Sequence, residues 1–146
     1  MASKAGLSGN LSRSFIDTNI LVYTDDPGDP AKHSRAIGLV GDLLRQRTGV
    51  VSLQVLQEYF TTAMGKLKLA ADVAKRRIEA FARMQVVEPK LTDILAAIDL
   101  HRLHRVTYWD ALILRTASQS GCRILLSEDM PHGQVIDGVR IVNPFL

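Results

Sequence analysis

The stretch SFIDTNIL, residues 14–21, places an acid directly after a short apolar run. Ser14 to Asp17 has the length and composition of a buried β-strand. Further along the chain, short apolar or β-branched runs alternate with longer segments of helical period, which is the pattern of parallel strands joined by helical crossovers. The sequence therefore predicts an α/β protein with Asp17 at the end of its first strand.

The remaining elements follow from the same alternation. The other predicted strands are Gly49 to Ser52, Arg123 to Ser127 and Val139 to Val142, with a weaker one at Gln85 to Glu88. The predicted helices cover about residues 30–46, 53–66, 70–84, 92–104 and 108–120. The side chains predicted to face the core include Ala74, Ile78 and Phe81 in one helix and Ile94, Ile98 and His101 in another. We expect a mostly parallel sheet of four to five strands, flanked by helices.

Length and composition indicate one domain and a cytoplasmic protein. A chain of 146 residues with 47% hydrophobic and 23% charged residues has the balance of a globular domain. We expect a flexible tail over residues 1–12 and one domain over residues 13–146. The single cysteine, Cys122, cannot form an internal disulfide, and no apolar run approaches the roughly 20 residues of a membrane span. The net charge of +3 fits a polyanionic partner, although it could equally serve solubility.

Four acids fall where parallel strands end or where the following helices begin. Asp17 closes the first strand, and Asp129 follows the run Ile124 to Ser127. Glu58 lies in the second turn of one predicted helix, and Asp110 lies in the first turn of another. Because the carboxyl ends of parallel strands share one edge of a sheet, all four are expected at that edge. Such a concentration of like charge raises the pKa of at least one carboxylate and creates affinity for cations.

The ions that suit such a cluster are Mg²⁺ and Mn²⁺, which prefer oxygen ligands. Two ions roughly 3.5–4 Å apart can activate a water and stabilise the leaving oxygen of a phosphodiester. We expect Asp17 and Asp110 to hold the principal ion, while Glu58 and Asp129 tune it or recruit a second. The sequence contains no Walker motif, no G-x-S-x-G motif and no Cys/His zinc pattern that would indicate another chemistry.

Each acid also has a local explanation. Asp110 follows Thr107 as in a helix capping box, and Asp17 could belong to a polar strand-to-helix turn. Asp129 could lie in a solvated loop, where Glu128 competes for any role assigned to it. Independent solvated acids have no reason to fall repeatedly at the carboxyl ends of successive strands, so their concurrence favours a site.

The motifs FIDTNIL (15–21), QEY (57–59), YWDALI (108–113) and LSEDM (126–130) resemble the four acidic motifs of PIN-domain nucleases, and VapC-type toxins of bacterial toxin–antitoxin pairs most of all. The resemblance covers about residues 14–144. It implies a PIN-like three-layer α/β/α fold, Mg²⁺ or Mn²⁺, and endonucleolytic cleavage of RNA that leaves a 5′-phosphate and a 3′-hydroxyl.

The resemblance also assigns roles by position. Asp17, Glu58, Asp110 and Asp129 match the acidic residues, with Asp129 the least secure as a direct ligand because the fourth motif varies most. Thr18, Asn19 and Ser127 match polar positions that assist the metal shell. Similarity to the toxins implies a homodimer and a cognate antitoxin, whose peptide occupies the groove beside the active site.

Trp109 and the basic residues are harder to assign. Trp109 could stack on an unpaired base, but packing in the core, where it would anchor its helix, is the stronger interpretation. His132 follows Asp129 closely and is predicted not to be catalytic. Basic residues that could contact RNA, or simply be solvated, form two sets: His101, Arg102, His104 and Arg105, and Lys66, Lys68, Lys75, Arg76 and Arg77.

Three other functions stay open at this stage. An aspartyl phosphatase of the haloacid-dehalogenase type would want a second Asp two residues after the first, where this chain has Asn19. A catalytically inert RNA-binding module would keep the sheet without the chemistry. A nuclease acting on DNA or on other RNA-processing substrates is also compatible, because no reader of the 2′-hydroxyl stands out.

Overall fold

The computed structural model describes residues 12–146, so the tail predicted for residues 1–12 lies, apart from Ser12, outside the described residues. Within this range the predicted α/β architecture is confirmed. The strands are β1 (Ser14–Ile16), β2 (Gly49–Ser52), β3 (Gln85–Val87), β4 (Ile124–Leu126), β5 (Val135–Ile136) and β6 (Val139–Val142). They form one sheet in the order β3-β2-β1-β4-β6-β5, and each pairing except β5 with β6 is parallel.

Strand β1 lies in the middle of the sheet because its residues are apolar on both faces. Phe15 and Ile16 are fully buried, as expected for a parallel strand covered by helices on both sides. Phe15 is in register with Val50 of β2 and Leu125 of β4. The residue after β1 therefore emerges at the centre of the carboxyl edge, which is where ligands bind in open parallel sheets.

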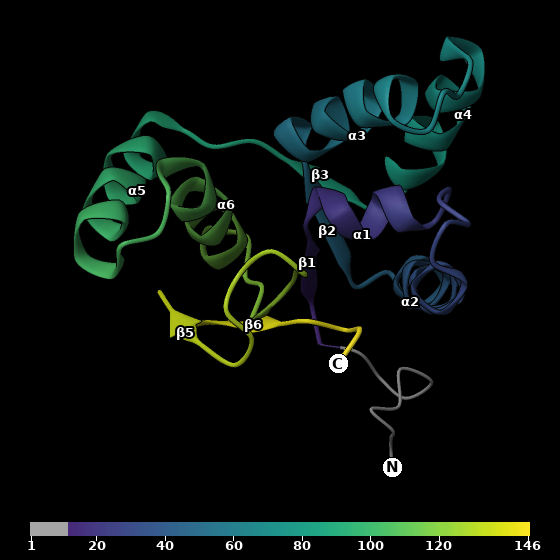
Figure 1. Cartoon of the computed structure of the whole chain (residues 1–146). Coiled ribbons are helices and arrows are strands. Elements are labelled where there is room, and N and C mark those ends of the chain that lie inside the picture. The colour runs from purple at the N-terminus through teal and green to yellow at the C-terminus, as the bar shows by residue number, and fades with distance from the viewer. Residues whose placement is uncertain (1–11) are drawn as a thin grey trace.

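The helices form two groups, one on each side of the sheet (Figure 1). They are α1 (Thr18–Tyr23), α2 (Pro30–Gln46), α3 (Leu53–Gly65), α4 (Ala71–Phe81), α5 (Leu91–His104) and α6 (Tyr108–Gln119). Helices α1 to α4 lie on one side, and α5 and α6 pack against each other on the other side. The arrangement is the expected three-layer α/β/α fold.

Two elements are additional to the prediction. Helix α1 has only six residues, and its run Ile20 to Val22 is buried throughout, so the sequence lacks the alternation that marks a surface helix. Strand β5 has two residues and pairs with β6 through the turn Asp137-Gly138, whose φ angles of 53° and 78° are those of a type I′ hairpin. The sheet thus has six strands among the described residues, rather than four or five.

The predicted inward face of the fifth helix was wrong for two residues. Ile98 is 41% exposed and His101 is exposed as well, whereas Asp93 and Ala97 are buried. The helix is turned because Arg115 of α6 donates to Asp93 at 3.0 Å, which brings an acid to the helix–helix contact. The stripe predicted in α4 is correct, since Ala74 and Phe81 are buried.

Helices α3 and α4 form a hairpin that is tied to the end of α1 by one acid. Asp25 accepts a hydrogen bond from the Tyr59 hydroxyl at 2.6 Å and another from the Arg77 Nε at 2.8 Å. The Tyr59 side chain is fully buried and meets Phe81 of α4 edge to face, with ring centroids 5.1 Å apart. This tie fixes how α3 sits over α1, and α3 carries one of the predicted site acids.

Two predictions from composition concern Cys122 and the membrane. Cys122 is buried, and burial raises the pKa of its thiol to about 11. Over residues 12–146, none of the helices has the length and apolar character that crossing a membrane requires.

Candidate active site

Asp17 is held at the carboxyl edge by β1 and by three hydrogen bonds to its side chain. Its carboxylate accepts from the backbone N–H of Thr18 at 2.8 Å, so it caps α1, and from the Ser127 hydroxyl at 2.8 Å. A longer bond comes from the Asn19 Nδ2 at 3.3 Å. The residue is only 7% exposed, and its position directly after the central strand accounts for this burial.

Asn19 and Ser127 join the end of β1 to the loop after β4. The Asn19 Nδ2 also donates to the Asp129 carboxylate at 3.1 Å, and its Oδ1 accepts from the backbone N–H of Glu128. The Ser127 hydroxyl accepts from the backbone N–H of Asp129 at 3.1 Å. Two of the three predicted supporting residues, Asn19 and Ser127, therefore contact Asp17 as well as backbone or side-chain atoms of residues 127–129.

Glu58 reaches the same rim from α3. The Thr18 hydroxyl donates to its Oε1 at 2.8 Å, and the Gln54 Nε2 donates to its Oε2 at 3.3 Å. Its side chain is exposed, although apolar residues occupy the neighbouring positions of α3. Glu58 is thus an exposed carboxylate that two polar partners orient.

Asp110 lies in the first turn of α6, on the other side of the sheet. Its backbone N–H donates to the Thr107 hydroxyl at 3.1 Å, which is the capping interaction that the sequence suggested. Its side chain is half-buried and remains close enough to Asp129 and Glu58 for their charges to act on it. A capping position and a place at the acidic rim are therefore compatible.

The electrostatics show that the acids share one region. Burial raises the pKa of Asp17 to about 6; hydrogen bonds from Ser127 and Thr18 oppose the rise, and the charges of Asp110 and Asp129 add to it. The pKa of Asp110 is raised by burial, and Asp129 and Glu58 contribute. The side chains nevertheless form no ready-made cage, because residues 12–146 contain no group of three or more His, Cys, Asp or Glu side chains placed to hold an ion.

Glu128 and Asp129 are distinguished by their partners. The Glu128 carboxylate forms an ion pair with Lys32 and accepts a hydrogen bond from the Tyr23 hydroxyl at 2.8 Å. These contacts direct Glu128 towards α2, whereas Asp129 faces Asn19 and the other acids. Neither Tyr23 nor Lys32 was singled out from the sequence, and no motif there marks them.

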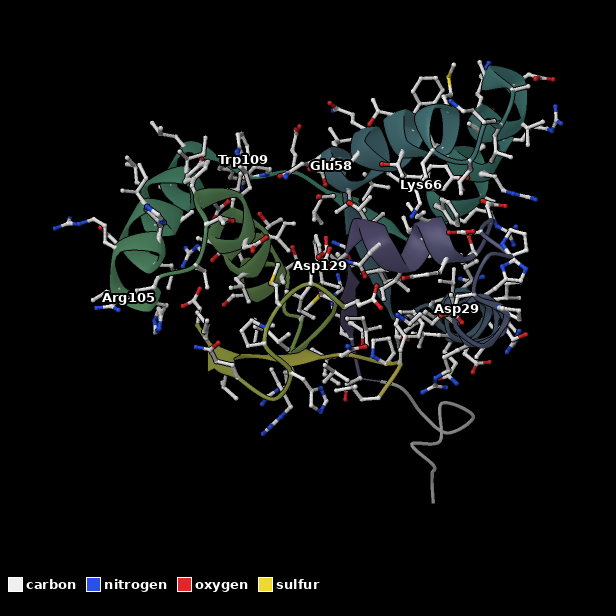
Figure 2. The ribbon with its side chains drawn as sticks, viewed as in Figure 1. Asp29, Glu58, Lys66, Arg105, Trp109 and Asp129 are labelled. Atoms are coloured by element: carbon white, nitrogen blue, oxygen red, sulfur yellow. The ribbon has the colours of Figure 1, made fainter. Side chains whose placement is uncertain are left out.

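Two hollows adjoin the acidic rim. One, of about 290 Å³, is lined by Thr18, Asn19 and Asp129 together with Lys66, so one residue of the predicted basic sets lies beside the acids. The other, of about 550 Å³, is lined by Glu58 and Trp109, which face one another from α3 and α6 (Figure 2). Core packing of Trp109 was the wrong interpretation, because this side chain is 60% exposed.

The remaining candidates lie apart from the rim or have other partners. His132 is exposed, and its Nδ1 accepts from the backbone N–H of Asn143 at 3.0 Å. Arg77 pairs with Asp25, and Arg76 pairs with Asp72. Arg105 lies at the far end of α5, well away from Asp129 (Figure 2).

Comparison with known proteins agrees with this architecture. The family model of the PIN domain matches residues 14–132, which is most of the chain. The chain therefore belongs to the PIN domain family, as the acidic motifs predicted. The crystal structure of Mycobacterium tuberculosis VapC20, described as a sarcin-ricin loop cleaving toxin, matches with a TM-score of 0.63 and 18% identity, over 80% of this chain and 89% of that one. This likeness is one of fold. No curated protein sequence matches the chain.

Proposed function

We propose that this PIN-domain protein is a metal-dependent endoribonuclease that hydrolyses RNA phosphodiester bonds with Mg²⁺ or Mn²⁺. The observation that carries the proposal is the geometry of the rim: Asp17 is 7% exposed at the end of the central strand, and Asn19 joins it to Asp129. Burial raises the pKa of Asp17 to about 6, and the charges of Asp110 and Asp129 add to the rise. A buried acid surrounded by like charge is costly for the fold, and a cation would relieve that cost.

The donor set fits a divalent cation that keeps most of its water. A carboxylate offers about four acceptor positions, and three hydrogen bonds occupy positions on Asp17, so room for a cation remains. Mg²⁺ typically takes one or two carboxylates and retains several waters. An open rim of oxygen donors suits this habit better than a closed cage does. When bound, the cation would supply Lewis acidity and an activated water for hydrolysis.

The chain's own residues would then divide the work. Asp17 and Asp110 would provide the principal carboxylates, while Glu58 and Asp129 would act from the two sides of the rim, Asp129 through water. Thr18 orients Glu58, and Asn19 holds Asp17 and Asp129 at one distance from each other. These hydrogen bonds limit side-chain motion and so keep the carboxylate oxygens positioned for an incoming phosphate.

RNA is the substrate that we propose, cleaved to leave a 5′-phosphate and a 3′-hydroxyl. Lys66 lines the hollow beside Asp129 and can partly neutralise a strand that approaches the acids. The similarity in fold to VapC20, whose description names cleavage of an RNA loop, favours RNA over DNA.

We further propose that the protein is the toxin of a toxin–antitoxin pair, acting on RNA in the cytoplasm as a homodimer. The outer face of α5 supports a second copy, since Leu91, Leu95 and Ile98 are 70%, 55% and 41% exposed and follow one another at helical spacing. An apolar stripe of this kind usually marks an interface. The antitoxin peptide would occupy the hollow that contains Lys66 and Asp129.

The test is digestion of transfer, ribosomal and messenger RNAs with mapping of the cleaved ends. We expect cleavage in the presence of Mg²⁺ or Mn²⁺. We expect no cleavage in EDTA and none by the Asp17→Asn variant. Undiminished cleavage by that variant would contradict the assignment.

A small phosphate ester should not be hydrolysed, because Asn19 stands where a phosphatase needs its second acid and is engaged by Asp17, Asp129 and Glu128. Retained RNA binding without any metal binding by calorimetry would indicate an inert binding module instead.

A further inference from the structure

Trp109 is an exposed aromatic beside the acidic rim. It is the second residue of α6 and immediately precedes Asp110. Its indole meets the Tyr108 ring edge to face, with centroids 5.1 Å apart, which limits its rotation. Because Trp109 is 60% exposed, its side chain gains only part of the free energy that full burial would provide. Its surface is therefore available to a ligand.

The hollow next to Trp109 has the size and lining of a small-ligand pocket. Its volume of about 550 Å³ falls within the range of about 300–1,000 Å³ that such pockets occupy. The rest of the wall combines apolar side chains with side-chain amides, namely Leu53, Pro89, Leu112, Gln54 and Gln57. A flat apolar surface with amide donors and acceptors at its border suits a planar heteroaromatic ring.

The charged residues that line the hollow favour a neutral base over a phosphate group as its ligand. Its charged lining residues are Glu58 and Glu88, and it is lined by no lysine or arginine of the described chain. Two carboxylates repel a phosphate group but tolerate a neutral ring. Lysine lies instead in the other hollow, beside Asp129, where Lys66 stands.

The hollow is continuous with the rim through Glu58. This carboxylate lines the hollow and also accepts from the Thr18 hydroxyl, which belongs to the residue after Asp17. Only the Glu58 side chain therefore lies between a group that contacts Trp109 and the proposed reaction centre.

We infer that this hollow is a base-binding subsite, in which an unpaired nucleobase adjacent to the scissile phosphate stacks on Trp109 and meets the amides of Gln54 and Gln57 with its edge. The inference rests on the proposed nuclease function and narrows its substrate to RNA that is single-stranded at the cleavage point. A paired base cannot offer its face, because its neighbours in the duplex cover it.

The binding test uses the fact that Trp109 is the sole tryptophan of the chain. Titration of the protein in EDTA with a single-stranded pentaribonucleotide is expected to quench its emission saturably. The same strand in a duplex should not quench, and an abasic nucleotide at one position should abolish the effect. In the control, Trp109→Phe combined with Val135→Trp moves the fluorophore to the exposed first position of β5, where RNA should leave the emission unchanged.

The kinetic test uses Trp109→Ala and Trp109→Phe. Loss of one stacked base is expected to lower kcat/KM on single-stranded RNA about ten- to hundredfold in the alanine variant, and the phenylalanine variant should recover most of it. Mg²⁺ affinity by calorimetry should not change in either. The matched control Val135→Ala, at another exposed apolar position, should cleave as the wild type does.

Three results would overturn the subsite. One is RNA that binds without altering Trp109 emission, and another is full activity of Trp109→Ala. The third is a blue-shifted emission that ignores RNA but changes on dilution, which would mean that a second copy fills the hollow. In each case wild-type cleavage would stand, whereas a wild type that neither binds nor cleaves RNA would refute the proposed function itself.

Discussion

Replacing Asp17 by Asn should stabilise the metal-free protein at neutral pH while abolishing its activity. Asp17 has a pKa of about 6 in the folded protein against an ordinary value of 3.8. The difference of roughly two units corresponds to about 3 kcal/mol of unfavourable free energy when the carboxylate is ionised and the protein is folded.

The asparagine keeps part of the local geometry. Its Oδ1 can still accept from the Thr18 N–H, and the Ser127 hydroxyl can turn to accept from the new amide. The Asn19 amide loses its acceptor on this side, which costs about 1 kcal/mol. The net gain at pH 7.5 is therefore about 2 kcal/mol, or about 4–8 °C in melting temperature for a domain of this size.

The effect has a defined pH dependence. Because the pKa is raised on folding, the stability contributed by protonated Asp17 is fully present below pH 3.8 and is lost as the pH rises through about 6. The wild type should gain stability as the pH is lowered across this window, and the variant should not gain from this group. The difference in stability between the variant and the wild type should reach zero at about pH 4.5.

The assay is calorimetric unfolding of both proteins in EDTA at pH 7.5 and pH 4.5. Glu79→Gln serves as the control, because this exposed carboxylate lies on α4, which carries none of the acids around Asp17, and its loss should change stability by less than about 0.5 kcal/mol. A wild type that is at least as stable as Asp17→Asn at pH 7.5, or a difference between them that does not vary with pH, would refute the argument.

Three more predictions follow from the site and the surface. Saturating Mg²⁺, at about 100 times its Kd, should stabilise the wild type by about 2.7 kcal/mol in thermal unfolding, and Asp110→Asn should lose most of that gain. Asp129→Asn should reduce RNA cleavage about 10–100-fold, whereas Glu128→Gln, at a residue already paired with Lys32 and Tyr23, should leave it nearly unchanged; equal effects in an RNA-cleavage assay would contradict the distinction. Leu95→Lys should raise the Kd of the proposed dimer by roughly thirtyfold or more in analytical ultracentrifugation without unfolding the monomer. An unchanged Kd would show that the outer face of α5 is not the interface.

The sequence predicted the sheet and the convergence of the acids for one reason, namely that buried parallel strands have an unambiguous pattern. Phe15 and Ile16 read as strand, and Asp17 had to follow them at the carboxyl edge. The same logic failed for α1, where Ile20 to Val22 are buried on every side and carry no period. The Asp137-Gly138 dipeptide is typical of a hairpin turn, but no hairpin was predicted there, because the two residues of β5 are too few to show a strand pattern.

Side-chain partners across the fold were not predictable in this way. The choice between Glu128 and Asp129 depends on Lys32, which lies 96 residues away from Glu128 in the chain. The orientation of α5 depends on an acid, Asp93, facing inward to meet Arg115, which reverses the usual preference of charge for solvent. Trp109 likewise lies in the wall of a hollow that residues of α3 and α6 line, and it is 60% exposed, whereas its hydrophobicity predicted packing in the core.

The position of Glu58 at the rim depends on Asp25, a residue that lies outside the rim. Its carboxylate holds Tyr59 and Arg77, and Tyr59 is the next residue after Glu58 on α3. Tyr59 faces the interior and Glu58 faces the rim, so a shift of α3 moves both side chains. Replacing Asp25, which follows α1 and lies outside the acidic rim, is therefore expected to displace Glu58 and to weaken the proposed reaction.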